Sequence, residues 1–337
     1  MVLKVNGQKY RELEKNVLNE AILGHEKYYE ELKTLSAPSI YLWDKPYDHA
    51  FVYTLYGHEM YLTYIRYSIM SLRVVCPNAK IVIFVEAEMW QKAKDELKHL
   101  VFEHDIKFVN GKAACYKQVI ACHSELQRFK VCTFVDADLF FLGNEDGTMY
   151  QVTRDLKILL MNRPDAFVWA FARKEMPDIS NTVMHRRGRI ATTTPDTYIW
   201  DMEEELDYDI VGLIETQKIW NISYIFSFCP KKLVTPEYKS WAMYSMFNNN
   251  HCDETVWYLW GKKNDYKNYH WSTHFKDYLS ISSTTHKSDK KVHLFQPMFT
   301  DTMQTKTHRK FETMLAILEI ESKYRRLIND RLQQQQV

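Results

Sequence analysis

The chain has 337 residues, of which 46% are hydrophobic, so it can bury a sizeable core and is not disordered as a whole. Its 44 basic and 43 acidic residues nearly balance, which argues against a protein that mainly neutralises a nucleic-acid backbone. Aromatic residues reach 14%, which fits either a site that stacks on sugar rings and bases or a core built from large side chains.

Several absences bear on where the protein works. No segment approaches the roughly 20 apolar residues of a membrane helix. Residues 1–16 lack the apolar stretch of a signal peptide. The six cysteines form no C-x-x-C pair, and we interpret them as reduced. We therefore expect a soluble, cytoplasmic protein without an integral membrane segment.

The N-terminal part predicts a helical extension over residues 1–45. Residues 8–34 carry apolar side chains at helical spacing among many charges, which predicts one or two accessory helices. Pro38 and Pro46 then interrupt the pattern.

Residues 46–305 predict one α/β domain. Strands are expected at 50–56, 80–87, 106–109 and 131–142, with helices between them at 59–75, 89–102 and 116–129. The strands are almost uniformly apolar, which is typical of a mainly parallel, Rossmann-like sheet with helices on both faces. Such sheets bind ligands at the carboxyl ends of their strands. The chain has no G-x-G-x-x-G and no G-x-x-x-x-G-K-[ST], which argues against a dinucleotide dehydrogenase and a P-loop enzyme.

The second half continues with fewer regular signals. Strand-like runs cover 165–173, 220–230 and 290–299, and helices are expected at 237–247 and 253–263. A charged helix over 308–331 lies within a C-terminal segment, 306–337, that ends in a polar tail.

The sharpest chemical feature is Asp136-Ala137-Asp138, directly after the apolar run VCTFV. Alternation along a strand would point both carboxylates the same way, and two carboxylates on one side suit Mn²⁺ or Mg²⁺. A structural pair is the alternative. The second Asp-x-Asp, Asp207-Tyr208-Asp209, follows three glutamates without a leading strand, and we interpret it as solvated surface.

The segment FVDADLFFLGN (134–144) resembles the F-x-D-A-D-x-x-x-L-x-N signature of family 8 glycosyltransferases, the glycogenin and galactinol synthase type. Four further segments resemble motifs of that family in the same order, at 52–72, 220–230, 252–260 and 292–295. The resemblance covers roughly residues 50–300 and implies a single GT-A type domain.

The resemblance implies a metal site made by Asp136, Asp138 and His293, with the ion neutralising charge on the departing nucleoside diphosphate. It implies a nucleotide pocket lined by Tyr53, Thr54 and Leu55, partly through backbone groups, with Tyr61 stacked on the base and Ala137 contributing from within the motif. The basic residue of the family has no match at Ile120, and Lys117, one turn earlier, is the nearest substitute.

The resemblance also implies roles for Asn221, in binding the sugar or the acceptor, and for Asp253, in contacting sugar hydroxyls near the reacting carbon. If the family's retaining stereochemistry holds, Asp253 would stabilise or attack the oxocarbenium-like centre. Each role has a structural alternative: Asn221 as a turn residue, Asp253 as a helix N-cap, and His293 as a satisfied core histidine.

Two departures from the family pattern bear on substrate binding. The Gly and Lys expected after His293 are replaced by Leu-Phe-Gln-Pro, and HRRGR at 185–189 could supply positive charge to the diphosphate instead. Ser223 and Tyr224 stand where the family has Gly, which predicts a different acceptor.

We thus expect a Mn²⁺-dependent glycosyltransferase that moves a sugar from a nucleotide-diphosphate donor, UDP-linked by the resemblance, to a hydroxyl of a glycan, glycoprotein or small molecule. One alternative is a nucleotidyltransferase, which is disfavoured because YTLYGHEMY holds one Gly and no Lys or Arg. The other is a non-catalytic carbohydrate-binding protein on a decayed transferase fold, which the replaced Gly and Lys favour.

Overall fold

The structure is a computed structural model, and it describes residues 47–57, 59–97, 100, 106–110, 116–171, 221–247, 257, 260–261, 263–282, 290–295 and 303–334. Several sequence predictions lie outside these residues: the helices within 8–34, the basic run 185–189, the Asp207-Tyr208-Asp209 stretch and Asp253.

The centre of the molecule is a seven-stranded sheet with the order β3-β2-β1-β4-β7-β6-β8. Only β7 runs against its neighbours, and the remaining pairings are parallel. The strands are β1 Tyr47–Leu55, β2 Ile81–Val85, β3 Ile106–Asn110, β4 Phe129–Val135, β6 Ala166–Phe171, β7 Asn221–Phe228 and β8 Lys267–His270. The predicted α/β class with a mainly parallel sheet is confirmed.

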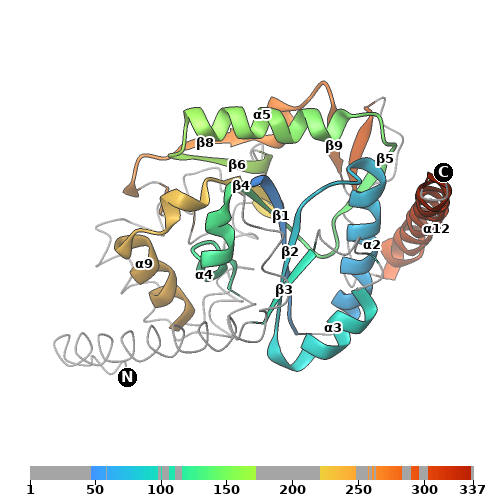
Figure 1. The fold of residues 1–337 in the computed structure, drawn as a ribbon, viewed down its shortest axis with the longest axis horizontal. Coiled ribbons are helices and arrows are strands. Elements are labelled where there is room, and N and C mark those ends of the chain that lie inside the picture. The colour runs from blue at the N-terminus through green and yellow to red at the C-terminus, as the bar shows by residue number, and fades with distance from the viewer. Residues whose placement is uncertain are drawn as a thin grey trace.

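Helices cover both faces of this sheet. Alternate β1 residues such as Phe51 and Tyr53 share one hydrophobic cluster with α2 Met60–Val75, α3 Trp90–Leu97 and α5 Thr148–Asn162. The opposite face is covered by α4 Lys117–Ile120 and α9 Pro236–Phe247, which lie on the other side of the strands from α2 and α3 (Figure 1).

Large aromatic side chains fill the layer between the sheet and α9. Phe226 stacks on Trp257 with ring centroids 4.3 Å apart, and Phe134 stacks on Phe228 at 5.4 Å. Trp169 and Trp257 are fully buried. Much of the aromatic surplus therefore serves the core, where each such side chain removes a large apolar area from water.

A second sheet, which the sequence did not predict, continues directly from the Asp-Ala-Asp segment. Its strands are β5 Phe140–Gly143, β10 Val292–Phe295 and β9 Leu279–Ser282, in the order β5-β10-β9. Gly143 is required there, because a Cβ at that position would lie 2.6 Å from the carbonyl oxygen of Lys291.

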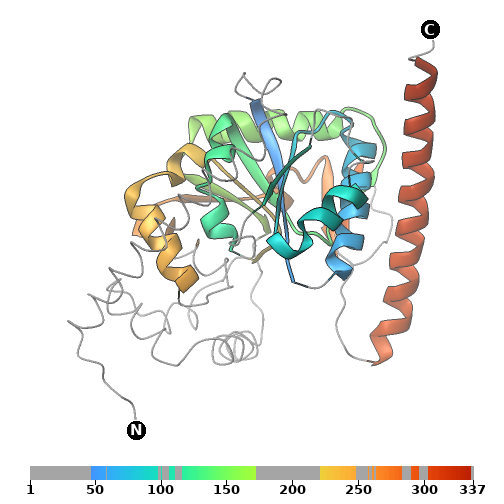
Figure 2. The same ribbon diagram turned by 60° about the horizontal axis from the view of Figure 1, so that its bottom comes forward.

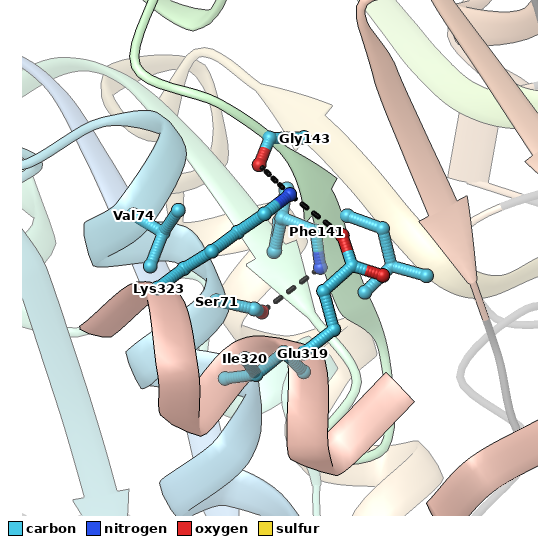
Figure 3. A pocket seen from close by; sticks show the side chains of 8 residues that line it. Ser71, Val74, Phe141, Gly143, Glu319, Ile320 and Lys323 are labelled. Atoms are coloured by element: carbon cyan, nitrogen blue, oxygen red, sulfur yellow. Dashed lines mark hydrogen bonds and ion pairs between the residues drawn. The ribbon is translucent and has the colours of Figure 1, made fainter. Parts of the chain in front are cut away.

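The C-terminal helix α12, Met303–Gln334, stands beside α2 and extends past the sheet at its C-terminal end (Figure 2). Figure 3 shows the pocket between α12, α2 and β5, where Lys323 Nζ donates to Gly143 O at 2.7 Å and to Glu319 Oε1 at 2.6 Å. Ser71 of α2 accepts a hydrogen bond from Phe141 N in the same place. The helix is thus fastened to the strand that follows Asp138.

One helix prediction was wrong in its extent. The segment 116–129 holds the short helix α4 and then a 3-10 turn, η4 Ser124–Arg128, rather than one continuous helix. His123 interrupts it by adopting an extended backbone, and its Nδ1 accepts a hydrogen bond from Glu125 N at 3.0 Å. Such a side-chain cap starts a new turn and competes with helix continuation.

Two further findings concern the cysteines and the helices. The described cysteines, Cys76, Cys122, Cys132 and Cys229, are free thiols. None of the helices in the described part of the chain combines the length and the apolar character needed to cross a membrane.

Candidate active site

The side of the sheet on which new strands are added switches between β1 and β4. From β1 the chain adds β2 and β3 on one side, and β4 then pairs with β1 on the other side. Ligands of open α/β sheets bind in the crevice outside the carboxyl ends of the strands at such a switch point. Val52 pairs with Phe134, so continuing this register by two residues brings Thr54 level with Asp136.

Asp136-Ala137-Asp138 lies at this crevice, directly after the last residue of β4. The segment is a turn and not a strand, because Leu139 N donates a hydrogen bond to Asp136 O at 3.0 Å. The prediction that strand alternation aligns the two carboxylates was therefore wrong. Asp136 and Asp138 are both partly exposed, whereas Ala137 is buried, and the turn itself presents the two acids at the sheet edge.

Lys117 forms an ion pair with Asp136. Its Nζ lies 2.5 Å from Asp136 Oδ1, and the two side chains are 15% and 19% exposed. The pair is only partly hydrated, so it is screened less than a surface ion pair. A carboxylate offers about four lone-pair positions, so Asp136 can accept from Lys117 and bind a metal ion at once. The donor set of two carboxylates fits a hard divalent cation.

Asp138 lies close enough to Tyr64 of α2 for its charge to act on the Tyr64 hydroxyl. Burial raises the pKa of Tyr64 to about 12, with a smaller contribution from the negative charge of Asp138. Tyr61, one turn earlier in α2, has its ring centroid 6.4 Å from that of Tyr64 and is 41% exposed. A solvent-facing ring beside the crevice can stack on a base or a sugar.

The β1 residues of the predicted pocket are buried. Tyr53 and Leu55 are fully buried in the core, and the Tyr53 hydroxyl forms a 3.0 Å hydrogen bond with Ser68 Oγ. These two residues can therefore offer a ligand only their backbone groups. Thr54 points to the other face of the sheet and is 7% exposed.

His293 lies in the small sheet, where it pairs with Leu142 of β5. It is 8% exposed, and its Nδ1 forms a 2.7 Å hydrogen bond with Ser280 Oγ. A metal ion would therefore have to bind Nε2, with Ser280 holding the ring. Within the described residues no three His, Cys, Asp or Glu side chains form a group that could hold a metal, so Asp136, Asp138 and His293 are not gathered in this way.

Asn221 is the first residue of β7, the reversed strand. Because β7 is antiparallel and Ile225 pairs with Val135, Asn221 lies at the same sheet edge as Asp136. The structure therefore brings Asn221, Lys117 and the two aspartates to one edge of the sheet.

A residue that the sequence reasoning missed is Glu86, which follows β2 as Asp136 follows β4. Its carboxylate Oε2 accepts a hydrogen bond from Gly57 N at 3.0 Å, and its own N donates to Leu55 O at 2.9 Å. The available signal was an acid directly after the apolar strand IVIFV.

No protein-family model matches the chain, and no curated protein sequence matches it. Among solved structures, it is similar to mouse xyloside xylosyltransferase 1 in its apo form, at 12% identity over 73% of this chain and 96% of that chain, with a TM-score of 0.44. It is also similar to the galactosyltransferase LgtC in complex with donor and acceptor sugar analogs, at 11% identity over 80% and 95%, with a TM-score of 0.41.

A third similar structure is 4-diphosphocytidyl-2C-methyl-D-erythritol synthase from Anaerococcus prevotii, at 13% identity over 68% of this chain and 88% of that chain, with a TM-score of 0.36. These likenesses concern the fold alone. Membership of glycosyltransferase family 8 stays a prediction.

Proposed function

We propose that the chain is a glycosyltransferase that moves a sugar from a nucleotide-diphosphate donor to an acceptor hydroxyl with the help of Mn²⁺ or Mg²⁺. The observation that carries the proposal is the position of Asp136 and Asp138, which follow β4 at the switch point of the sheet. A pair of carboxylates in that crevice suits a metal-bound diphosphate better than a neutral ligand.

The chain's own residues would divide the work at the diphosphate. Asp136 and Asp138 would hold the ion. His293, which the described structure does not gather with them, would have to approach the ion through Nε2 to act as a third ligand. A bound divalent cation supplies charge neutralisation to the departing nucleoside diphosphate. Lys117 keeps Asp136 oriented through its 2.5 Å ion pair and adds positive charge beside the leaving group.

The nucleoside would lie over the ends of β1 and β2. Backbone groups of Tyr53 and Leu55 would line its pocket, and Tyr61 would stack on the base. We take uracil as the donor base from the resemblance. Asn221, the first residue of β7, would bind the sugar or the acceptor at the same edge of the sheet. Asp253 would contact the sugar near the reacting carbon, with retention of configuration.

A direct test is a screen of nucleotide sugars with the full chain and Mn²⁺, reading hydrolysis to free nucleoside diphosphate. The expected result is release from at least one donor, and its loss on adding EDTA. A nucleotidyltransferase would instead form pyrophosphate from a nucleoside triphosphate and a sugar phosphate. That outcome, or binding of glycans without any metal-dependent binding of nucleotides, would overturn the proposal.

A further inference from the structure

Glu86 is fixed at the carboxyl edge of the sheet, beside the end of β1. Leu55 pairs with Val85, so Glu86 is level with Tyr56, the first residue after β1. Two hydrogen bonds hold it there, from Glu86 N to Leu55 O at 2.9 Å and from Gly57 N to Glu86 Oε2 at 3.0 Å. The carboxylate is therefore tied to the turn that leads from β1 into α2.

The surroundings leave this carboxylate as an acceptor. Gly57 has a φ of +76°, and a Cβ built on it would meet nothing within 4 Å, so the turn borders open space. The two lysines of α3 interact elsewhere: Lys92 Nζ lies 2.7 Å from Glu59 Oε2, and Lys94 Nζ lies 5.3 Å from the centroid of the Trp90 ring. A carboxylate accepts several hydrogen bonds and donates none, and one oxygen already takes the Gly57 N–H.

The ring edges of the four common bases differ in what they offer such an acceptor. Uracil presents the N3–H donor, and guanine presents N1–H together with its exocyclic amine. Cytosine and adenine present an unprotonated ring nitrogen at the same place. Their exocyclic amines can donate to a carboxylate, but a carboxylate held opposite the ring nitrogen would face that nitrogen acceptor to acceptor. A rigid carboxylate opposite the ring nitrogen therefore favours bases that carry a ring N–H.

We propose that Glu86 reads the base of the donor nucleotide by accepting a hydrogen bond from its ring N–H, which restricts the donor to uracil or guanine nucleotides. Tyr61 is exposed in the first helical turn of α2, which follows the Gly57 turn, and it would stack on that base. The proposal rests on the nucleotide-sugar function and adds a residue that sets its base specificity.

The test is calorimetric titration of UDP, GDP, CDP and ADP into the full chain with Mn²⁺. The wild-type protein should bind UDP or GDP at least about 10-fold more tightly than CDP and ADP, the scale of one hydrogen bond to a charged group. Comparison of UDP with GDP shows which of the two bases is preferred. Glu86→Ala should remove the discrimination, whereas Glu88→Ala, which removes the same charge two residues away on an exposed turn, should keep it.

Glu86→Gln separates base reading from support of the turn. Its amide oxygen can still accept from Gly57 N, while its amide N–H₂ now offers a donor to the base, so preference should shift toward CDP and ADP. An equal loss of affinity for all four nucleotides in Glu86→Ala, with unchanged ratios in Glu86→Gln, would overturn base reading. Metal-dependent binding that discriminates no base in the wild type would overturn it while leaving the proposed function intact. Absence of any nucleotide binding would overturn both.

Discussion

Two groups of polar side chains contact β4, one in the interior of the sheet and one at the carboxyl end of the strand, and they differ in charge. Inside the sheet, His49 Nε2 forms a 2.8 Å hydrogen bond with Thr133 Oγ1, which forms a 2.7 Å hydrogen bond with Ser227 Oγ. Trp271 Nε1 completes this interior chain by donating to Ser227 Oγ at 3.1 Å. At the carboxyl end of the same strand, Lys117 and Asp136 form a partly exposed ion pair.

The difference lies in what burial tolerates. Polar groups inside the sheet are neutral and satisfy one another, because a buried donor or acceptor without a partner costs free energy. The charged pair at β4 lies at the edge of the sheet, where water and a ligand can both reach it. We therefore expect substitutions in the interior chain to change stability, and substitutions at the edge to change binding and turnover.

The largest effect is expected for Asp136→Asn and Asp138→Asn. Each should lower metal-dependent turnover at least about 100-fold while the melting temperature changes little, because a partly exposed carboxylate is removed together with a metal bond. Donor hydrolysis and thermal melts measure the two quantities. Asp277→Asn, on an exposed turn, is the matched control. Undiminished metal-dependent turnover in the double variant would remove the two aspartates from the site.

The interior counterpart is Thr133→Val. The hydroxyl of Thr133 is fully buried between His49 and Ser227, so its loss leaves two polar groups without their shared partner. The free energy of unfolding should fall by about 1–3 kcal/mol. Denaturant titration measures this, and the affinity for UDP and Mn²⁺ should stay unchanged. A selective loss of nucleotide affinity without destabilisation would contradict the division between interior and edge.

His293 is the residue that tests where the boundary lies, because it is buried like the interior chain but predicted to bind the metal. His293→Ala should weaken Mn²⁺-dependent UDP binding by about 10-fold. Ser280→Ala should produce a smaller loss of the same kind, since Ser280 holds the ring. If both variants lose only stability, and UDP binding with Mn²⁺ is unaffected, His293 belongs to the core and the predicted third ligand is wrong.

The smallest effect is a pH dependence from the interior chain. Burial lowers the pKa of His49 to about 3, from an ordinary value of 6.5. Between these values the unfolded chain binds more protons, so stability present above about pH 6.5 is lost as the pH falls. The slope should not exceed about 1.4 kcal/mol per pH unit. Denaturant titrations at pH 7.5 and 5.5 measure it, and His49→Gln should flatten the difference. An unchanged slope in that variant would assign the pH dependence to other groups.

The sequence alone predicted most of the local elements of the first half and the position of two acids at the sheet edge. Apolar runs predicted the strands of the first half, except that the run 131–142 is divided by a turn into β4 and β5. The acids after VCTFV predicted an edge site, and both signals are encoded in neighbouring residues. Lys117 was identified as the substitute for a missing basic residue, and the structure brings its ammonium group to Asp136.

Only the tertiary structure decided how these parts meet. The reversal of β7, the β5-β10-β9 sheet and the link between Glu86 and Gly57 depend on residues far apart in the chain, which no local pattern records. The predicted alternation of Asp136 and Asp138 was wrong because the chain leaves the sheet in a turn at Asp136, and a turn does not have the two-residue period of a strand. Strand order also decided the use of the aromatic residues, since the rings of β4, β6 and β7 become neighbours only once the strands pair.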